Sequence, residues 1–408
     1  MRTRAGEPTT GPATGQPLWD LVVVGAGPAG SATALGALAA DPTLRVLLLD
    51  RADFPRDKSC GDGIAPEAVD ALASVGAGDV VEGWAPIERL ELAGDRARVS
   101  RALSRPVWVV PREVFDARLV GHATRAGAVL RRHRVRDVEV GSDAVAVDVE
   151  TRARVVVGAD GAHSVVRSRI GPAGAGRRAI AIRGYAPTPP GRRNTQLIAY
   201  GDRRQPSYAW AFDRGDGLSN VGYGELLDDR SAAPSRALLL GELDRLVSGA
   251  GADVRDWRAH HLPLSRWRFT QADGPVLLTG DAAGLVNPMT GEGIYYAVAS
   301  GILAGRAAAA AVRSGRPHAA GAAYRGALRA LIGRHLRHTF VTSRLSTAPA
   351  VVDAGIRAAA RDQEVFDDLV EIGLGGGVVS PRLVTGLVRS LFTGSRGRPA
   401  DPLPSVTQ

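Results

Sequence analysis

Cysteine is nearly absent from this sequence of 408 residues, in which Cys60 is the only one. A single cysteine cannot form a disulfide within the chain, and it cannot supply the several thiolates of a zinc cage or an iron–sulfur cluster. The sequence also has no H-E-x-x-H motif and no histidine cluster of the kind that binds metals. It therefore predicts no metal site and no internal iron–sulfur relay.

Lysine is equally scarce, because Lys58 is the only lysine although Lys and Arg together number 51. The net charge of +9 is therefore carried by arginines, which are scattered along the chain. Nucleic-acid-binding proteins gather their basic residues on one face or in a recognisable motif. We interpret the charge as a coding preference for arginine and predict no nucleic-acid partner, although some arginines would suit an anionic substrate or an acidic membrane surface.

An uncharged stretch at residues 21–40 is long enough to imitate a membrane span or a signal peptide. It is rich in Gly and Ala, contains Pro28 and directly follows Asp20, so a strand, a turn and a helix explain it better. We expect a cytoplasmic protein without a targeting segment, with peripheral contact to a membrane left open. The sequence does not define the oligomeric state.

The glycine turn in this stretch is typical of a dinucleotide site. Residues 21–24 are apolar and predict a strand buried on both faces, as in a parallel sheet. Gly25, Gly27 and Gly30 follow with the spacing G-x-G-x-x-G. The first glycine permits a tight turn, the second lets a diphosphate approach the backbone, and the third lets the next helix pack on the strand. That helix, residues 28–40, would direct its N–H groups and dipole at the diphosphate.

A second apolar strand at residues 45–50 supports this interpretation. It ends in Asp50, at about the distance expected for a group that hydrogen-bonds the ribose of an adenosine. A polar loop at 51–63 follows, in which glycines flank Asp62. Cys60 lies in this loop with Arg56 and Lys58 near it in sequence, which would lower the pKa of its thiol if they are also near in space. A buried, inert cysteine is the alternative.

Three further segments could approach the same ligand. Arg112 stands where a strand at 107–110 leads into a helix at 113–126, and it would either bind the cofactor or remain solvated. A strand at 155–158 leads into Asp160, Gly161 and a helix. A strand at 275–279 leads into Asp281, a Pro/Gly loop and an Ala-rich helix that starts near residues 291–293.

An aromatic strand stands out at residues 206–212. Tyr208, Trp210 and Phe212 alternate with alanines, so all three point to one side of the strand. Residues 218–224 are predicted to form its hairpin partner. Such aromatics are usually core, but they would also suit an apolar or unsaturated substrate that lies across a sheet.

Together these segments resemble the geranylgeranyl reductase family, within the FAD-dependent oxidoreductases built like para-hydroxybenzoate hydroxylase. The resemblance spans residues 18 to 390, and four motifs carry it besides the glycine turn: Lys-Ser-Cys-Gly-Asp-Gly at 58–63, Tyr-Ala-Trp-Ala-Phe at 208–212, Asn-Val-Gly at 220–222 and Asp-Ala-Ala-Gly-Leu-Val-Asn-Pro at 281–288. The aromatic run usually ends in proline in these reductases, whereas here it ends in Asp213.

The resemblance implies an α/β fold: a Rossmann-like FAD-binding domain with an inserted antiparallel β-sheet substrate domain and C-terminal helices. It implies noncovalent FAD, NAD(P)H or another reductant as electron donor, and an isoprenoid or prenylated substrate whose C=C bonds are reduced. Asp281 would then accept hydrogen bonds from the ribityl chain, and the helix after it would direct its positive end at the flavin ring.

The expected site residues fall into three groups. The expected catalytic residues are Cys60 and Asp62, and the expected substrate-binding residues are Tyr208, Trp210 and Phe212. The expected cofactor-binding residues are Gly25, Gly27, Pro28, Ala29, Gly30, Asp50, Arg51, Cys60, Gly61, Arg112, Asp160, Gly161, Gly280, Asp281, Pro288, Gly291, Gly293 and Ile294.

The expected division of the chain follows the same segments. It comprises a disordered lead (1–17), the first part of the FAD-binding domain (18–84), FAD-binding residues with a β-meander (85–174), a substrate-binding β-sheet domain (175–270), the last part of the FAD-binding domain (271–315), a C-terminal helical region (316–395) and a tail (396–408).

Two other functions fit the same residues. In a flavin monooxygenase, reduced FAD and O₂ would hydroxylate or epoxidise an aromatic or prenylated small molecule. A non-catalytic flavoprotein would only carry electrons. Cys60 and the aromatic strand favour the reductase. In the reductase, Cys60, a neighbouring tyrosine or water would deliver the proton, and the sequence does not choose among them.

Overall fold

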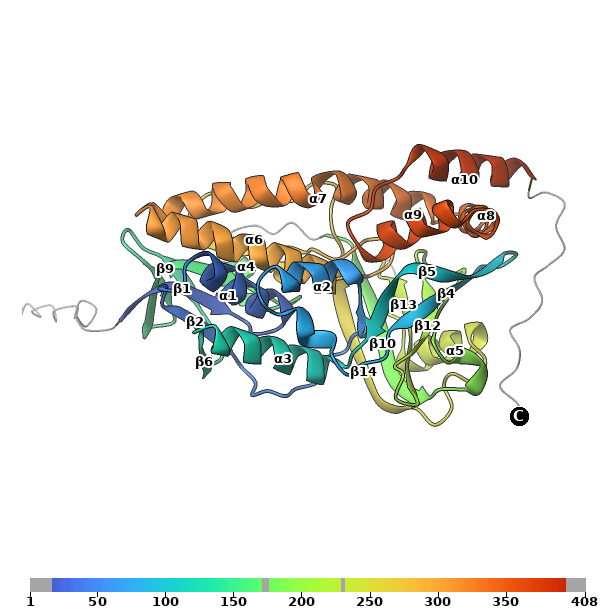
Figure 1. The fold of residues 1–408 in the computed structure, drawn as a ribbon, viewed down its shortest axis with the longest axis horizontal. Coiled ribbons are helices and arrows are strands. Elements are labelled where there is room, and N and C mark those ends of the chain that lie inside the picture. Colours follow the sequence, from blue (N-terminus) through green and yellow to red (C-terminus); the bar gives the residue numbers. More distant parts are fainter. Residues whose placement is uncertain (1–16, 171–175, 229–231, 394–408) are drawn as a thin grey trace, which may run out of the picture.

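The computed structural model describes residues 17–170, 176–228 and 232–393. The predicted tail, and all of the predicted disordered lead except residue 17, lie outside these residues. Two sheets stand side by side, and long helices run along their upper edge (Figure 1). The predicted α/β class is confirmed.

The first sheet has a parallel centre. Its strands in the described residues are β6 (Val129–Arg132), β2 (Val46–Asp50), β1 (Leu18–Val24), β9 (Thr151–Gly158), β15 (Val276–Leu278), β8 (Val145–Val147) and β7 (Val138–Val140). β1 lies parallel between β2 and β9, so that Val22 stands between Leu47 and Val156. All three side chains are fully buried, because helices or the β7–β8 region cover both faces of the sheet.

Two helices pack unusually closely behind the glycine turn. They are α1 (Pro28–Ala40) and α6 (Ile294–Arg313). A Cβ atom on Gly301 would lie 2.3 Å from the carbonyl oxygen of Ala29, and one on Gly305 would lie 2.1 Å from that of Thr33. Only glycine permits this approach. Among the described residues, α6 is the one helix long and apolar enough to cross a membrane, but 83% of its apolar window is buried, as in a core helix.

The second sheet carries the predicted aromatic strand. Its strands in the described residues are β14 (Arg255–Pro263), β10 (Arg178–Pro187), β13 (Leu218–Leu226), β12 (Tyr208–Asp213), β11 (Thr195–Tyr200), β4 (Ile87–Ala93), β5 (Arg98–Val109) and β3 (Gly63–Ile64). β12 and β13 form the predicted antiparallel hairpin. Ala209 and Ala211 face a core that includes Leu239 and Leu243 of α5 (Arg236–Leu246), so the aromatic residues between them face the opposite way.

One predicted boundary differs from the structure. Residues 85–174 were expected to be FAD-binding residues with a β-meander, whereas β4 and β5 of this segment belong to the second sheet. β4 pairs in parallel with β11, and β5 pairs with β4 and β3. Their alternating apolar residues, such as Leu92 and Val99, bury against Ile356 and Phe366 of the C-terminal helices. The rest of the segment, from α3 (Arg112–Arg125) to β9, surrounds the first sheet as expected.

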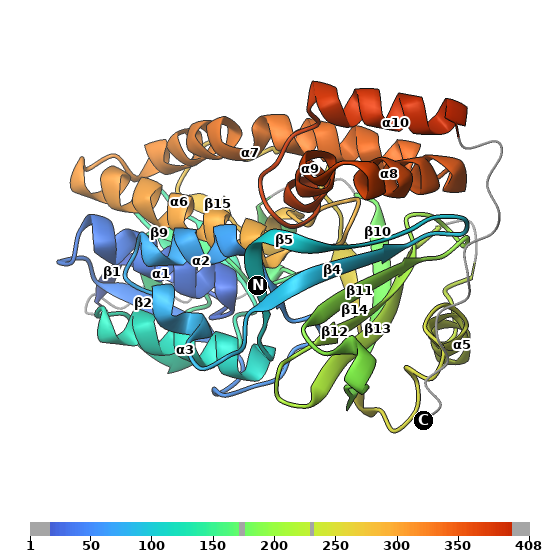
Figure 2. The same cartoon turned by 45° about the vertical axis from the view of Figure 1, so that its right-hand side comes forward.

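The C-terminal region is helical, as predicted. Figure 2 shows these helices above both sheets, with α8 and α9 over the long β4–β5 hairpin. The remaining helices of the described residues are α2 (Pro66–Ala73), α4 (Val165–Arg169), α7 (Ala320–Leu345), α8 (Pro349–Arg361), α9 (Gln363–Leu374) and α10 (Pro381–Thr393), with short 3-10 turns at Gly78–Val81, Pro190–Arg192, Gly280–Ala283 and Pro317–Ala319.

Candidate active site

A cavity of about 780 Å³ lies between the two sheets. Its lining brings together the glycine turn, the loop that contains Cys60, the aromatic strand and the segment that leads into α6. All of the predicted site residues line this cavity except Gly30 and Gly280, which pack against the elements that line it. The first of these packs α1 on β1, since a Cβ on Gly30 would lie 1.7 Å from the oxygen of Gly25. Gly280 packs against Ala29 and Ala297.

The glycine turn has the geometry that its spacing predicted. Gly25 has φ +100°, and a Cβ there would lie 2.4 Å from the oxygen of Ala159. The next glycine, Gly27, leaves the backbone open toward the cavity. A Cβ built on it would meet guanidinium nitrogens of Arg56 at 3.4 Å and of Arg112 at 3.8 Å. Two positive charges therefore stand where a diphosphate would approach.

These arginines are held by a carboxylate that the sequence did not reveal. Asp116 lies one turn after Arg112 on α3, and its two oxygens accept hydrogen bonds of 2.7 and 2.9 Å from that guanidinium. Arg56 reaches the same carboxylate at 3.0 Å. Asp116 is fully buried, so it fixes both cations in place. The i, i+4 spacing of Arg112 and Asp116 was the signal available in the sequence.

Asp50 lies at the end of β2, beside the turn. Its Oδ2 accepts a hydrogen bond of 2.8 Å from the N–H of Ala26, and its Oδ1 accepts one of 2.9 Å from Ala52. Both carboxylate oxygens keep lone pairs for a ribose hydroxyl. Arg51 is exposed at the edge of the cavity.

Asp160 lines the cavity and also holds the start of α4. It accepts hydrogen bonds from the hydroxyl of Ser164 at 2.6 Å and from the N–H of Val165 at 2.7 Å. Ser164 caps α4 by accepting from the N–H of Arg167. The neighbouring Gly161 has φ +81° and forms the turn itself.

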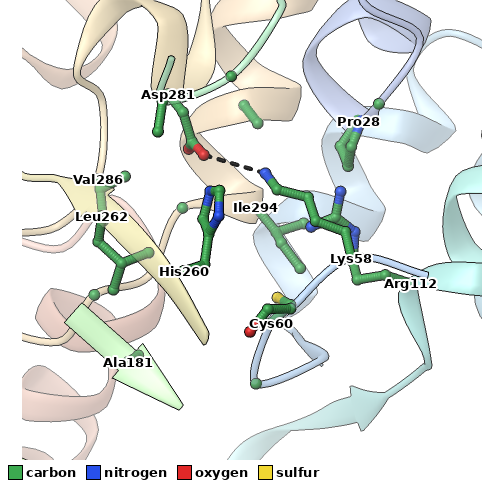
Figure 3. A pocket seen from close by; sticks show the side chains of 18 of the residues that line it. Pro28, Lys58, Cys60, Arg112, Ala181, His260, Leu262, Asp281, Val286 and Ile294 are labelled. Atoms are coloured by element: carbon green, nitrogen blue, oxygen red, sulfur yellow. Dashed lines mark hydrogen bonds and ion pairs between the residues drawn. The ribbon is translucent and has the colours of Figure 1, made fainter. Parts of the chain in front are cut away.

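The only lysine of the chain contacts a predicted cofactor residue. Lys58 lies 3.2 Å from Asp281, with His260 beside the pair (Figure 3). Burial raises the pKa of Asp281, but Lys58, together with His260 and Arg112, holds that pKa below its usual value. Burial, and after it Lys58, lowers the pKa of His260 to about 4. At neutral pH the site thus holds an ion pair beside a neutral imidazole.

The start of α6 faces the cavity, as predicted, with Gly293 preceding its first residue. Glu292, a residue that sequence reasoning did not single out, accepts a hydrogen bond of 2.9 Å from the N–H of Tyr295. Burial raises the pKa of Glu292 to about 7. This carboxyl therefore accepts from one of the backbone N–H groups at the start of α6 that have no partner within the helix. In the sequence, Glu292 could have been identified by its position between the predicted residues Gly291 and Gly293.

Comparison with known proteins agrees with this geometry. The family described as FAD binding domain matches residues 19–330. Menaquinone reductase of Mycolicibacterium smegmatis is 34% identical over 309 residues, which cover 70% of this chain and 75% of that protein. Geranylgeranyl diphosphate reductase of Rhodobacter capsulatus is 33% identical over 320 residues, which cover 73% and 77%. The chain belongs to the geranylgeranyl reductase family of FAD-dependent oxidoreductases.

A solved structure supports the fold of this oxidoreductase. The geranylgeranyl bacteriochlorophyll reductase-like protein of Thermoplasma acidophilum superimposes with a TM-score of 0.77. The alignment covers 93% of this chain and all of that one, at 19% identity. The oxidoreductase thus has the predicted FAD-binding fold with its second sheet.

The cavity's residues fit FAD. The open backbone at Gly27 and the two fixed guanidiniums match a diphosphate, and Asp50 matches a ribose. Asp281 and the start of α6 line the part of the cavity that also holds Cys60 (Figure 3). In this arrangement Arg56, Arg112 and Asp50 would hold the nucleotide, and Asp281 the ribityl chain.

The thiol of Cys60 differs from the sequence expectation. Arg56 and Lys58 were expected to lower its pKa, but burial raises it. Those two cations pair with Asp116 and Asp281 instead, and the cation that acts on the thiol is Arg112. Arg112 offsets part of the effect of burial. Cys60 is therefore a protonated thiol at neutral pH.

A buried network ties the Cys60 loop to the second sheet. Trp210 donates from Nε1 to the Oδ1 of Asn220 at 2.8 Å. Because tryptophan can only donate, the amide nitrogen of Asn220 must face the loop. That nitrogen donates at 2.8 Å both to the carbonyl oxygen of Cys60 and to Oδ2 of Asp62. Asn220 is fully buried. Its three hydrogen bonds align the Cys60 loop with the aromatic strand, which gives the first residue of the Asn-Val-Gly motif a structural role.

Asp62 is the most constrained residue of the loop. It is fully buried with φ +60°, and its Oδ2 also accepts a hydrogen bond of 2.6 Å from the hydroxyl of Tyr185, the residue paired with Asn220 across β10 and β13. Its Oδ1 has no hydrogen-bond partner among the described residues. Burial raises the pKa of Asp62 to about 6. Sequence reasoning named Asp62 but missed Tyr185 and Asn220 as its partners.

The aromatic residues face the loop across the cavity. Ring centres lie 5.9 Å apart for Tyr208 and Trp210, and 6.4 Å apart for Trp210 and Phe212. A Cβ on Gly61 would lie 3.6 Å from the ring of Phe212, so the loop lies directly against this surface. Asp213, where the family usually has proline, points away and caps a turn by accepting from the N–H of Asn194 at 2.6 Å. Its carboxylate does not line the cavity.

Proposed function

We propose that this oxidoreductase reduces C=C bonds of an isoprenoid or prenylated small molecule, with NAD(P)H or another reductant as electron donor. The observation that carries the proposal is the aromatic face of Tyr208, Trp210 and Phe212, which shares one cavity with the FAD-binding segments and the Cys60 loop. An apolar, aromatic wall suits a hydrocarbon chain and keeps water away from it. The reductase relatives support the same reaction class.

Bound FAD would supply the two electrons and one hydrogen that the alkene gains. The chain's own task is to hold the alkene, to exclude water and to deliver the second hydrogen as a proton. The hydroxyl of Tyr208 donates to the carbonyl oxygen of Thr290, which joins the aromatic wall to the loop before α6.

Cys60 is the proposed proton donor. Its thiol is protonated at neutral pH and lines the cavity, whereas burial raises the pKa of Tyr208 further above the usual value of tyrosine. The hydroxyl proton of Tyr208 is moreover engaged by the carbonyl oxygen of Thr290, which leaves the thiol as the proposed donor. After the proton leaves Sγ, the guanidinium of Arg112 would stabilise the thiolate. Asp62 acts through Cys60, because its negative charge raises the pKa of the thiol and keeps the proton there until it is needed.

The test is mass spectrometry of products. The purified FAD-loaded protein is given NADPH or dithionite and a panel of prenylated compounds, once in air and once without oxygen. A gain of two hydrogens per double bond that persists without oxygen is the expected result. A gain of one oxygen atom that requires air would establish a monooxygenase instead, and oxidation of the reductant with no change in any compound would leave an electron carrier.

A further inference from the structure

Two outer helices of the C-terminal region carry positive charge and no acidic residue. In both views α7 and α10 lie along the upper edge of the molecule (Figures 1 and 2). Neither helix contains Asp or Glu. Their arginines are Arg325, Arg329, Arg334, Arg337 and Arg344 on α7, and Arg382 and Arg389 on α10. Arg325 pairs with Asp273, and Arg382 pairs with Glu364 and Asp368 of α9. The exposed cations that matter below are therefore Arg334 and Arg337 of α7.

The exposed side of α10 is apolar. One face of the helix carries four apolar residues: Val384, and at 4, 7 and 8 residues after it Val388, Leu391 and Phe392. Their exposed fractions are 47%, 44%, 40% and 82%. The opposite side of α10 packs on the molecule through Leu383, which belongs to a core cluster with α8 and α9. We call the four exposed residues the α10 stripe.

The C-terminal half of α7 shows the same combination of exposed apolar and basic residues. Arg334, Arg337, Val341 and Leu345 follow one another at intervals of three and four residues and therefore share a face. Val341 is 43% exposed and Leu345 is 52% exposed, and both arginines are exposed. Apolar side chains flanked by arginines on surface helices are typical of proteins that bind the interface of a membrane.

The helix layer that carries these residues also adjoins the cavity. Leu374, at the end of α9, and Met289 line the cavity. Met289 packs on the same core cluster as Leu383 of α10. Asn287 donates to the carbonyl oxygen of Ile372 at 2.8 Å, which anchors the loop before α6 to the end of α9. One wall of the cavity is therefore built against the layer that displays the α10 stripe.

We propose that the α10 stripe and the exposed face of α7 bind the surface of an anionic lipid bilayer. The apolar side chains would enter the interface between headgroups and acyl chains, and the arginines would contact anionic headgroups. A second copy of the chain would suit this surface poorly, because two basic faces repel each other. This inference rests on the surface alone and does not depend on the substrate proposed above.

The experiment is sedimentation of the FAD-loaded full chain with vesicles of phosphatidylcholine alone and of phosphatidylcholine mixed with phosphatidylglycerol. Wild type is expected to bind the anionic vesicles much more tightly. Each arginine near an anionic surface contributes about 1 kcal/mol, which corresponds to about fivefold in affinity. The double variant Arg334→Gln/Arg337→Gln should therefore weaken binding about 30-fold. Val388→Ser/Phe392→Ser should weaken it about tenfold or more, from lost apolar burial.

Matched controls change the same residue types elsewhere on the surface. Arg131→Gln/Arg152→Gln removes two exposed arginines of the first sheet, and Val140→Ser/Val149→Ser removes two exposed valines. Neither should alter vesicle binding. Melting temperature and the flavin absorbance spectrum verify that each variant folds.

Four results would overturn the proposal. They are no binding to either vesicle, equal binding to both, equal losses in the controls, or a wild-type dimer in analytical ultracentrifugation that Val388→Ser/Phe392→Ser separates. Activity on a short, water-soluble prenyl compound is measured in parallel. Failure of that activity with intact vesicle binding would refute the proposed function and leave the membrane surface standing.

Discussion

Replacing Asp62 by asparagine should stabilise the protein at neutral pH, although Asp62 is fully buried and hydrogen-bonded. The pKa of this carboxyl is raised from 3.8 to about 6. The folded protein therefore binds a proton at Asp62 more tightly than the unfolded chain does. Between about pH 4 and about pH 6 the unfolded chain releases this proton while the folded protein keeps it, so stability falls across this window as the pH rises, and the full cost is present above about pH 6.

The magnitude follows from the size of the shift. A shift of about two pH units at 1.36 kcal/mol per unit corresponds to about 3 kcal/mol at neutral pH. Asparagine cannot ionise, and its side-chain oxygen can accept the hydrogen bonds that Tyr185 and Asn220 donate to Oδ2. Its amide nitrogen would then occupy the place of Oδ1, which has no hydrogen-bond partner among the described residues, so the unpaired N–H groups offset part of the gain and about 3 kcal/mol is an upper bound. Asparagine also tolerates φ +60° well.

Urea denaturation of the FAD-loaded protein between about pH 5 and about pH 8 measures the effect. Asp62→Asn should exceed wild type by up to about 3 kcal/mol near pH 8, and the difference should shrink toward about pH 5. Asp95→Asn, which removes the same charge from an exposed side chain, should show no such trend. The reasoning is refuted if Asp62→Asn is the less stable protein at neutral pH, or if its advantage is the same at every pH.

Three further predictions concern the cavity. Gly30→Ala should abolish FAD binding, because its Cβ would lie 1.7 Å from the oxygen of Gly25; a normal flavin spectrum in the purified variant would contradict this. Cys60→Ser should keep FAD but lower the rate of alkene reduction by about 10²-fold or more, measured by product formation, and an unchanged rate would remove the thiol from the mechanism. Asn220→Ala removes three buried hydrogen bonds and should lower the free energy of unfolding by about 3 kcal/mol; a loss that leaves the fluorescence of Trp210 unaltered would argue against the network.

Several parts of the fold and the site could be predicted because short stretches of sequence specify them. The glycine turn needs Gly25 and Gly30 at fixed spacing, since a side chain at either place would clash with backbone only a few residues away or with the adjacent strand. Alternation at residues 208–212 settles which side of β12 is aromatic, because strand side chains alternate regardless of what surrounds them. The FAD-binding segments and the hairpin of β12 and β13 follow from such local patterns.

Other features depend on which distant segments meet. Asp116 joins Arg56 to Arg112, and Asn220 joins Trp210 to the Cys60 loop. The i, i+4 spacing indicates only the contact of Asp116 with Arg112, whereas the contacts with Arg56 and with the loop join segments far apart in the chain. The membership of β4 and β5 in the second sheet depends on pairing with β11, about a hundred residues later in the chain.

The sequence by itself determined the dinucleotide turn, the aromatic face and the chemistry available in the loop at residues 58–63. Only the tertiary structure decided the protonation state of the Cys60 thiol in this loop. Arg56 and Lys58, which lie near Cys60 in sequence, pair with Asp116 and Asp281 instead, and burial raises the pKa of the thiol, which keeps its proton. A pKa sums desolvation and charge over everything that packs around a group, and most of those neighbours come from elsewhere in the chain.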